Sequence, residues 1–381
     1  MMGRSGSSSE RTHCLTYYRV SSLPETPLSA ESTPTVMRSV KILVTFHIAP
    51  ELLERIKAVD PGVEILYNPS LLGRPRYMND QHGAPIERTP EQEERLRGMM
   101  AEAEVLFGYV PRGYGRDIKG FFPLLRWNQS PSAGIGWGAK RSGWTETDID
   151  FTTASGMHAT PLAEFCLMSM LIFVKDFFHM AEEKRRRHWQ RTCATDLRGK
   201  TLAVVGLGRV GREVARLGMC LGMRVIGSKR HVEGVDPASV NVEQLYGWKN
   251  LEPMLGEADF LVLICPETEE TRGLIGEGEL SSMKEGSVLI NISRGSIVDE
   301  AALIRSLQSG RLGGAALDVA EVEPLPPDSP LWDMPRVIIS SHSASTVELE
   351  NERLTEIFCD NLRRYLDGRP LRNLLDKELL Y

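Results

Sequence analysis

The feature of this sequence that most constrains its fold is a glycine-rich turn between a predicted strand and a predicted helix. The segment GLGRVG, residues 206–211, matches the pattern G-x-G-x-x-G, follows the apolar run 201–205 and precedes the helical segment REVARLGMCLG. In such a turn the first glycine makes the bend, the second lets backbone approach a pyrophosphate, and the third lets helix and sheet pack closely. The N-terminus of the helix supplies free N–H groups for the phosphates. The turn predicts dinucleotide binding through Gly206, Gly208, Arg209, Val210 and Gly211; a purely structural turn is the alternative.

The next predicted strand ends without the acidic residue that NAD-binding proteins usually carry about 20 residues after the glycine motif. Ser228, Lys229 and Arg230 stand there instead. A carboxylate would repel a 2′-phosphate, whereas a serine hydroxyl can donate a hydrogen bond to it and two cations can pair with it. We therefore predict that NADP(H) is preferred and that NAD(H) is possible. An exposed basic loop without a ligand is the alternative.

Two sets of strand patterns predict two parallel sheets. Between residues 40 and 130 the strand-like runs KILVTF, VEILYN, EVLFGYV and LLRWNQS alternate with helical patterns and a long polar loop over 74–89, which is typical of βαβ units. After residue 200 six more strand-like runs follow, which fits a doubly wound nucleotide-binding fold. They are TLAVVGLG, MRVIGS, DFLVLICP, SVLINIS, GGAALDV and RVIISSH.

Helical patterns connect these two parts of the chain. We expect one continuous helix to begin near Thr160, to run through the apolar stretch 165–174, and to end in the basic segment 184–187. The last helical pattern, residues 347–366, and the tail after it come after all six strands. We expect them to return to the first part of the chain.

Composition excludes several classes of protein. The chain has 381 residues, 41% of them hydrophobic and 25% charged, as in ordinary globular proteins of two or three domains. The formal charge of −6 argues against binding to nucleic acid or an anionic membrane, and the run 165–174 is about half the length that spans a bilayer. The six cysteines are scattered without zinc-ligand spacing, which predicts no metal site and a reducing, cytoplasmic location.

The N-terminal segment has a different character. Residues 1–37 are rich in Ser, Thr and Pro and lack apolar periodicity, so we predict a disordered extension. A mitochondrial transit peptide is the alternative because Arg4, Arg11 and Arg19 lie among serines, but three glutamates depart from that pattern. Met37 directly precedes the first strand pattern and is an alternative start.

Three segments in register resemble the D-isomer-specific 2-hydroxyacid dehydrogenases: LVLICPETEETRGLIG, VLINISRGSIVDEAAL, and GGAALDVAEVEPLP followed by SSHSAS. The resemblance extends from about Lys41 to the C-terminus. It implies an α/β protein of two Rossmann-like domains, with a doubly wound coenzyme domain inserted into a discontinuous, flavodoxin-like substrate domain. The boundaries expected are 38–156 and 345–381 for the substrate domain and 157–344 for the NAD(P)-binding domain.

The resemblance also implies a catalytic set of Arg294, Glu323 and His342. Reduction of a 2-keto acid needs a proton at the carbonyl oxygen, which suits a histidine, and a neighbouring carboxylate favours the protonated ring and orients it. A guanidinium can bind the substrate carboxylate and polarise the carbonyl, which suits Arg294. Taken singly, a surface arginine, a loop acid and a satisfied histidine are the structural alternatives. Glu323 argues against the formate dehydrogenase branch, which has Gln at this place.

Further residues carry over from the same resemblance. Asp318 would face the nicotinamide carboxamide, and Cys265, Pro266 and Ser293 would line the coenzyme cleft. Ala133 and Gly134 lie in a turn whose backbone amides would hold the substrate carboxylate, and Tyr109 or Val110 would contact the substrate side chain. The family commonly has Asp just after this turn, where this chain has Gly136-Trp137.

The functional prediction is a cytoplasmic, NADP(H)-preferring reductase of small 2-keto acids, D-specific and without a metal. A homodimer is expected because the helix near the basic run 184–187 often lies at a dimer interface in this family; a solvated helix end is the simpler interpretation of that run. The alternatives are a dinucleotide-sensing binding protein like the C-terminal-binding-protein corepressors and a phosphonate or other oxyanion dehydrogenase. The sequence does not specify which 2-keto acid is the substrate.

Overall fold

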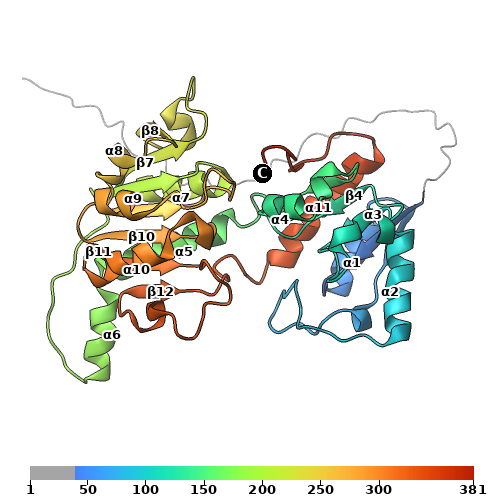
Figure 1. Ribbon diagram of the computed structural model, residues 1–381, viewed down its shortest axis with the longest axis horizontal. Helices are drawn as coiled ribbons and strands as arrows, with labels where there is room; N and C mark the ends of the chain where they lie inside the picture. The colour runs from blue at the N-terminus through green and yellow to red at the C-terminus, as the bar shows by residue number, and fades with distance from the viewer. Residues whose placement is uncertain (1–38) are drawn as a thin grey trace, which may run out of the picture. The chain divides into compact units, whose positions relative to one another are not determined.

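The computed structural model describes residues 39–381, and Figure 1 shows their arrangement into helices and strands. The predictions made for residues 1–37, including disorder, a transit peptide and a start at Met37, lie outside the described residues. Two parallel sheets organise the described chain, one of five strands and one of seven. The predicted α/β fold class is confirmed.

The second sheet in the chain has seven parallel strands in the order β12-β11-β10-β9-β6-β7-β8. Its strands are β6 (Thr201–Val205), β7 (Arg224–Lys229), β8 (Gln244–Gly247), β9 (Phe260–Leu263), β10 (Ser287–Asn291), β11 (Leu312–Leu317) and β12 (Val337–Ile339). The six predicted strands are all present, and β8 is an addition at the sheet edge. The strand order reverses between β6 and β9, and in open α/β sheets ligands bind beyond the carboxyl ends of the strands at such a point.

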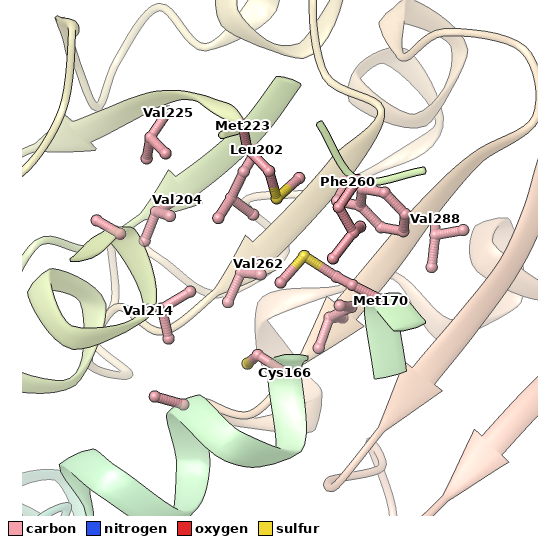
Figure 2. Packing of buried hydrophobic residues seen from close by; sticks show 14 of the residues in the cluster. Cys166, Met170, Leu202, Val204, Val214, Met223, Val225, Phe260, Val262 and Val288 are labelled. Atoms are coloured by element: carbon pink, nitrogen blue, oxygen red, sulfur yellow. The ribbon is translucent and has the colours of Figure 1, made fainter. Parts of the chain in front are cut away.

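Helices cover both faces of this sheet. On one face α5 (Ala159–Val174) and α7 (Arg209–Cys220) contribute to a core with the buried sides of β6, β7, β9 and β10. Figure 2 shows Cys166 and Met170 of α5 within this core, together with Val204 and Val262 of the sheet. On the other face α8 (Glu252–Leu255), α9 (Glu277–Ser282) and α10 (Glu300–Gln308) pack against the same strands. Burial on both faces explains the continuous apolar runs of the central strands.

The first sheet has five parallel strands in the order β2-β1-β3-β4-β5, which is the flavodoxin-like order. Its strands are β1 (Val40–Val44), β2 (Val63–Leu66), β3 (Val105–Phe107), β4 (Trp127–Gln129) and β5 (Asp150–Thr152). The helices that precede or follow them are α1 (Pro50–Lys57), α2 (Pro90–Glu102), α3 (Ile118–Phe121) and α4 (Gly136–Arg141).

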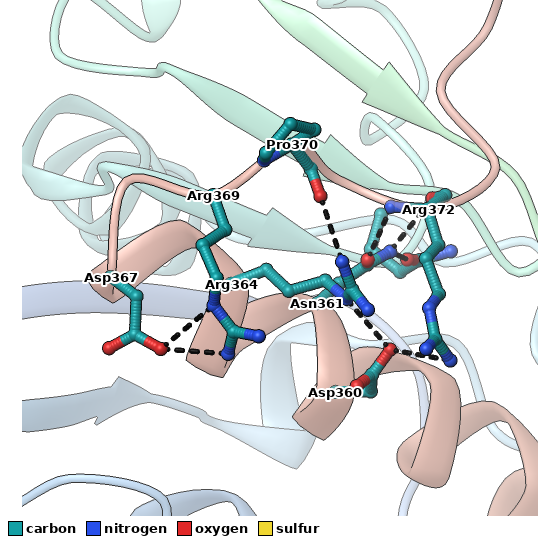
Figure 3. A network of polar contacts seen from close by, with 8 residues as sticks. Asp360, Asn361, Arg364, Asp367, Arg369, Pro370 and Arg372 are labelled. Carbon is teal, nitrogen blue, oxygen red and sulfur yellow. Dashed lines mark hydrogen bonds and ion pairs between the residues drawn. The ribbon is translucent and has the colours of Figure 1, made fainter.

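The last helix, α11 (Glu350–Leu366), packs on the first sheet and not on the second. The ring of Phe358 stacks on Phe107 and on Trp127, with centroids 4.0 and 5.1 Å apart. Within the helix, Asn361 exchanges two hydrogen bonds with the backbone of Arg372 in the tail, at 2.8 and 3.0 Å, which fixes the tail to the helix (Figure 3). Both ends of the described chain therefore contribute to one core. The residue boundaries of the two domains stay a prediction.

The prediction of one continuous helix from Thr160 to the basic segment is wrong. Helix α5 ends at Val174, Asp176 takes the left-handed conformation with φ of 52°, and α6 (Phe177–Arg185) begins after it. Aspartate tolerates this conformation better than most residues, and its carboxylate accepts a hydrogen bond of 3.1 Å from Arg336. No glycine or proline marks the break in the sequence. Among residues 39–381, no helix combines the length and apolar character that crossing a membrane requires.

Candidate active site

A cleft of about 750 Å³ is lined by residues from both sheets and brings together several predicted site residues. Tyr109 and Gly134 come from loops that follow strands of the first sheet, and Arg294, Glu323 and His342 follow β10, β11 and β12 of the second. Ala133, which was predicted to bind substrate, is exposed and is not among the residues that line the cleft.

The clearest catalytic geometry in the cleft is a histidine–carboxylate pair. Nδ1 of His342 lies 2.8 Å from Oε2 of Glu323, and the other carboxylate oxygen accepts a hydrogen bond of 3.2 Å from the Ala320 N–H. Burial would raise the pKa of Glu323, but the hydrogen bond and charge of His342 outweigh it, so the pKa lies below its ordinary value. The carboxylate is therefore ionised at neutral pH and can orient the ring with Nε2 left for a substrate.

The turn that carries His342 is held in a strained conformation by Asp318. Ser341 and His342 both have left-handed backbone, with φ of 51° and 54°, which costs free energy for residues other than glycine. Oδ1 of the buried Asp318 accepts hydrogen bonds from the Ser340 hydroxyl at 2.6 Å and from the amides of Ser343 and Ala344 at 2.8 and 2.9 Å. Sequence reasoning missed this role, because it assigned Asp318 only to the nicotinamide.

Arg294 lies where the two sheets' loops meet. Its guanidinium donates to the Ser293 carbonyl at 2.7 Å and to the Gly134 carbonyl at 3.1 Å. A Cβ atom on Gly134 would lie 1.9 Å from this guanidinium, so a larger residue there would displace the guanidinium from its present position. Gly295, the residue after Arg294, also packs closely, since a Cβ there would lie 1.9 Å from the Ala320 carbonyl oxygen. This second contact brings the turn after Arg294 close to the segment that leads to Glu323.

The polar loop 74–89 lines the outer part of the cleft, which sequence reasoning did not anticipate. Its anchor is Asp80, whose carboxylate accepts hydrogen bonds from Arg76 at 2.8 and 3.1 Å and from the Gly83 amide at 3.1 Å. Burial would raise the pKa of Asp80, but these hydrogen bonds and the Arg76 charge hold it well below its usual range. From this loop His82 stacks on Tyr109 with ring centroids 4.6 Å apart, and burial raises the pKa of the Tyr109 hydroxyl.

A second histidine–carboxylate pair also lines the cleft. Nε2 of His158 lies 3.0 Å from Oε1 of Glu350, and both side chains are largely buried. His158 precedes α5 and Glu350 is the first residue of α11. No motif in the sequence marks this pair, because its members are 192 residues apart.

The glycine turn has the geometry that a dinucleotide site requires. Gly206 has φ of 104°, and a Cβ on it would lie 2.7 Å from the Cys265 amide nitrogen. A Cβ on Gly211 would lie 1.9 Å from the Gly206 carbonyl oxygen, whereas no protein atom lies within 4 Å of a Cβ built on Gly208. The first and third glycines therefore serve the packing of the turn, and the second faces open space. Arg209 donates to the Ser155 carbonyl at 3.4 Å, and Val210 is half-buried.

The end of β7 offers groups for an adenosine ribose or its phosphate. Ser228 is 1% exposed, and its hydroxyl finds no hydrogen-bond partner among the described residues, an arrangement that is costly unless a ligand supplies one. Lys229 makes no ion pair within residues 39–381. Arg230, by contrast, pairs with Glu270 at 2.7 Å, which the sequence pattern did not predict.

Of the remaining predicted coenzyme contacts, Cys265 and Pro266 follow β9 and Ser293 follows β10. The Ser293 hydroxyl donates to the Cys265 carbonyl, and the Pro266 carbonyl accepts a hydrogen bond of 2.7 Å from the Thr271 hydroxyl. The residues at the glycine turn and the orphaned Ser228 hydroxyl thus fit a bound dinucleotide. Within the described part of the chain, no group of three or more metal-binding side chains forms a metal site.

Comparison with known proteins gives concordant matches. A family model described as the NAD-binding domain of D-isomer-specific 2-hydroxyacid dehydrogenases matches residues 167–344. A glyoxylate reductase of Aeropyrum pernix is 30% identical over 362 residues, which cover 90% of this chain and 98% of that relative. An (S)-sulfolactate dehydrogenase of Chromohalobacter salexigens is 38% identical over 226 residues, covering 59% of this chain and 72% of the relative.

Solved structures agree with these matches. A D-isomer-specific 2-hydroxyacid dehydrogenase of Xanthobacter autotrophicus, in complex with NADPH and MES, superposes with a TM-score of 0.72 at 26% identity, over 90% of this chain and all of that chain. An NADPH-dependent glyoxylate/hydroxypyruvate reductase of Sinorhizobium meliloti, in complex with NADP and sulfate, has the same TM-score at 25% identity and the same coverage.

Proposed function

Because the chain belongs to the D-isomer-specific 2-hydroxyacid dehydrogenase family, we propose that it reduces small 2-keto acids to D-2-hydroxyacids with NADPH. The observation that carries this proposal is the cleft in which the His342–Glu323 pair and the Arg294 guanidinium converge. Glyoxylate and hydroxypyruvate are the first substrates to test, since curated relatives are glyoxylate and glyoxylate/hydroxypyruvate reductases.

We assign each group in the cleft one task. Arg294 binds the substrate carboxylate and polarises the carbonyl with directional hydrogen bonds. His342 donates a proton from Nε2 to the carbonyl oxygen, while Glu323 keeps Nδ1 protonated and the ring in place. The bound nicotinamide supplies the hydride that the carbonyl carbon receives. The carbonyl thus gains one hydride at carbon and one proton at oxygen, which yields the 2-hydroxyacid.

The coenzyme is held by groups already in position. Amides at the start of α7 would hold the pyrophosphate at Gly208, and Ser228 with Lys229 would bind the 2′-phosphate. Structural relatives in complex with NADPH or NADP support this choice of coenzyme. NAD(H) is the alternative coenzyme, because Arg230 already pairs with Glu270 and that carboxylate competes with a phosphate for its guanidinium.

The test is oxidation of NADPH by the purified protein with a panel of 2-keto acids of graded length, with NADH in parallel. A His342→Asn variant is the control, because it keeps a polar side chain of similar size and cannot donate the proton. Turnover of at least one keto acid, lost in the variant, is expected. NADPH oxidation no greater than in the His342→Asn control would contradict the proposal and favour a dinucleotide-sensing role.

We also propose that the protein is a cytoplasmic homodimer with the domain boundaries predicted above. Helices α5 and α6 form an apolar groove in which Met168, Leu171, Phe177 and Met180 are exposed, and a second copy would cover it. The exposed thiol of Cys193 suits a reducing compartment. Light scattering of the native protein and of a Leu171→Glu variant tests the dimer, since a buried carboxylate at the interface should yield monomers.

A further inference from the structure

The short helix α4 carries a tryptophan whose ring has two cations near it. The Lys140 ammonium lies 5.6 Å from the centroid of the Trp137 ring, and the Arg272 guanidinium lies 5.7 Å from it. Lys140 belongs to the same helix, whereas Arg272 belongs to the loop that follows β9 of the second sheet. The ring therefore joins α4, which follows β4 of the first sheet, to the loop after β9 of the second sheet.

Two carboxylates of the loop after β9 complete this contact. Glu269 pairs with Lys140 at 3.0 Å, and Glu267 pairs with Arg272 at 2.8 Å. The same Glu267 oxygen accepts a hydrogen bond of 2.8 Å from the Ser296 hydroxyl. Glu267 is the better shielded of the two, with 16% of its side chain exposed against 72% for Glu269.

The contacts of Trp137 and Ser296 are close in sequence to the two partners of the hydrogen bond between Arg294 and Gly134. Gly134 precedes Trp137 by three residues, and Ser296 follows Arg294 by two residues in a single 3₁₀ turn, Gly295–Ile297. The Arg294 guanidinium reaches the Gly134 carbonyl at 3.1 Å. Any separation of α4 from the loop after β9 would therefore lengthen the contact that sets the direction of the Arg294 side chain.

We propose that Trp137, Lys140, Glu267, Glu269 and Arg272 form a latch that positions Arg294 for the substrate carboxylate, with Trp137 as its central positioning residue. This inference rests on the proposed function, in which Arg294 binds that carboxylate. Each exposed ion pair or cation–π contact is weak alone, but contacts that share one tryptophan ring and one loop are coupled. The family commonly has an aspartate just after this turn, where this chain has Gly136-Trp137, and the latch gives that departure a role.

The latch acts on substrate binding more than on coenzyme binding. Arg294 keeps its bond to the Ser293 carbonyl when α4 moves away, so the guanidinium stays in the cleft without its second anchor. No hydrogen bond or ion pair within residues 39–381 joins the glycine turn or the Ser228 side chain to the five latch residues. Loss of the latch should therefore raise KM for the keto acid and leave the dissociation constant of NADPH unchanged.

The experiment compares Trp137→Ala, Trp137→Phe and Glu269→Gln with the native protein. We measure kcat and KM for glyoxylate, the Kd of NADPH by fluorescence titration, and the Kd of oxalate, a two-carbon dianion, by calorimetry in the presence of NADP. Trp137→Ala should raise KM and the oxalate Kd about tenfold with a smaller change in kcat, and Trp137→Phe, which keeps an aromatic face, should restore much of the loss. The matched control is Trp248→Ala, since Trp248 also has a cation over its ring, Lys249 at 5.4 Å, but follows β8 at the sheet edge.

The outcomes separate the latch from the proposed function. Equal KM and oxalate affinity in the native protein and Trp137→Ala would overturn the latch alone. A native protein without turnover that binds oxalate, with weaker binding in Trp137→Ala, would refute the reductase and support the latch. A native protein that neither turns over keto acids nor binds oxalate would overturn both. An equal loss in Trp248→Ala, or a parallel loss of NADPH affinity, would also overturn the latch.

Discussion

Substitution of Gly208 by valine separates ligand binding from folding at the glycine turn. Gly208 is the N-cap of α7, its φ of −75° is open to any residue, and a Cβ there meets no protein atom within 4 Å. Valine is a poorer N-cap than glycine, so the folded state should lose only about 1 kcal/mol. The valine methyl groups would instead occupy the space through which helix amides reach a pyrophosphate.

The expected loss of binding free energy is larger than the loss of stability. A hydrogen bond to a charged group contributes about 1.5–3 kcal/mol, so losing one such bond should raise the NADPH dissociation constant about 10- to 150-fold. Calorimetric titration measures that constant, and thermal unfolding without coenzyme shows whether the fold is intact.

Two other glycines provide controls for this substitution. Gly278→Val in α9 is the matched one, because a Cβ there also meets nothing within 4 Å; NADPH affinity should stay unchanged. Gly211→Ala should instead lower the unfolding temperature, since its Cβ would lie 1.9 Å from the Gly206 carbonyl oxygen. Native NADPH affinity in Gly208→Val would refute the assignment of the second glycine to the pyrophosphate.

Three further predictions concern carboxylates. Glu323→Gln should lower kcat about a hundredfold or more. The pKa of Glu323 is lower in the folded protein than its ordinary value of 4.5, so the native protein should be more stable than this variant above pH 4.5. That advantage should be lost as the pH falls below 4.5, which unfolding midpoints measured across pH would show. Glu270→Gln releases Arg230 from its exposed ion pair and should strengthen NADPH binding by up to about fivefold with NADH unchanged, and an equal change for both coenzymes in parallel titrations would contradict this. Asp80→Asn weakens the anchor of Arg76 and should lower the free energy of unfolding by about 1–3 kcal/mol in urea titrations, whereas an unaltered midpoint would show that the loop does not depend on this charge.

The parts of the fold that the sequence predicts are those with dense, continuous apolar patterns. Strands such as β6, β9 and β10 are buried on both faces and read as unbroken apolar runs, so their pattern is strong. Strands β5 and β8 lie at sheet edges, have only three and four residues, and mix polar with apolar side chains, so no pattern marks them. The break between α5 and α6 escaped prediction because a left-handed aspartate has no sequence signature.

The same contrast holds for the site. The family resemblance selected Arg294, Glu323 and His342. They follow three neighbouring strands of one sheet, and the carboxyl ends of parallel strands share an edge, so the strand patterns agreed with that choice. The His158–Glu350 pair and the contact between Trp137 and Arg272 join residues far apart in the chain through side-chain packing. Such contacts depend on where two separate loops come to lie, which no local pattern specifies.

The coenzyme preference shows how a local rule meets its limit. The rule that an acid after the second strand favours NAD considers only the residues that follow one strand. No acid stands after β7, so the rule predicts NADP. In the fold, Glu270 of the loop after β9 pairs with Arg230 after β7, and thereby brings a carboxylate next to the predicted phosphate site. A 2′-phosphate gains the Arg230 guanidinium as a partner, beside Ser228 and Lys229, more readily when this pair is open. The ratio of NADPH to NADH affinity is therefore set by the strength of the Arg230–Glu270 pair as well as by Ser228 and Lys229. Salt screens exposed ion pairs, so it weakens the Arg230–Glu270 pair as well as the bond between Arg230 and a phosphate. NADPH affinity should therefore fall less steeply with ionic strength in the native protein than in Glu270→Gln.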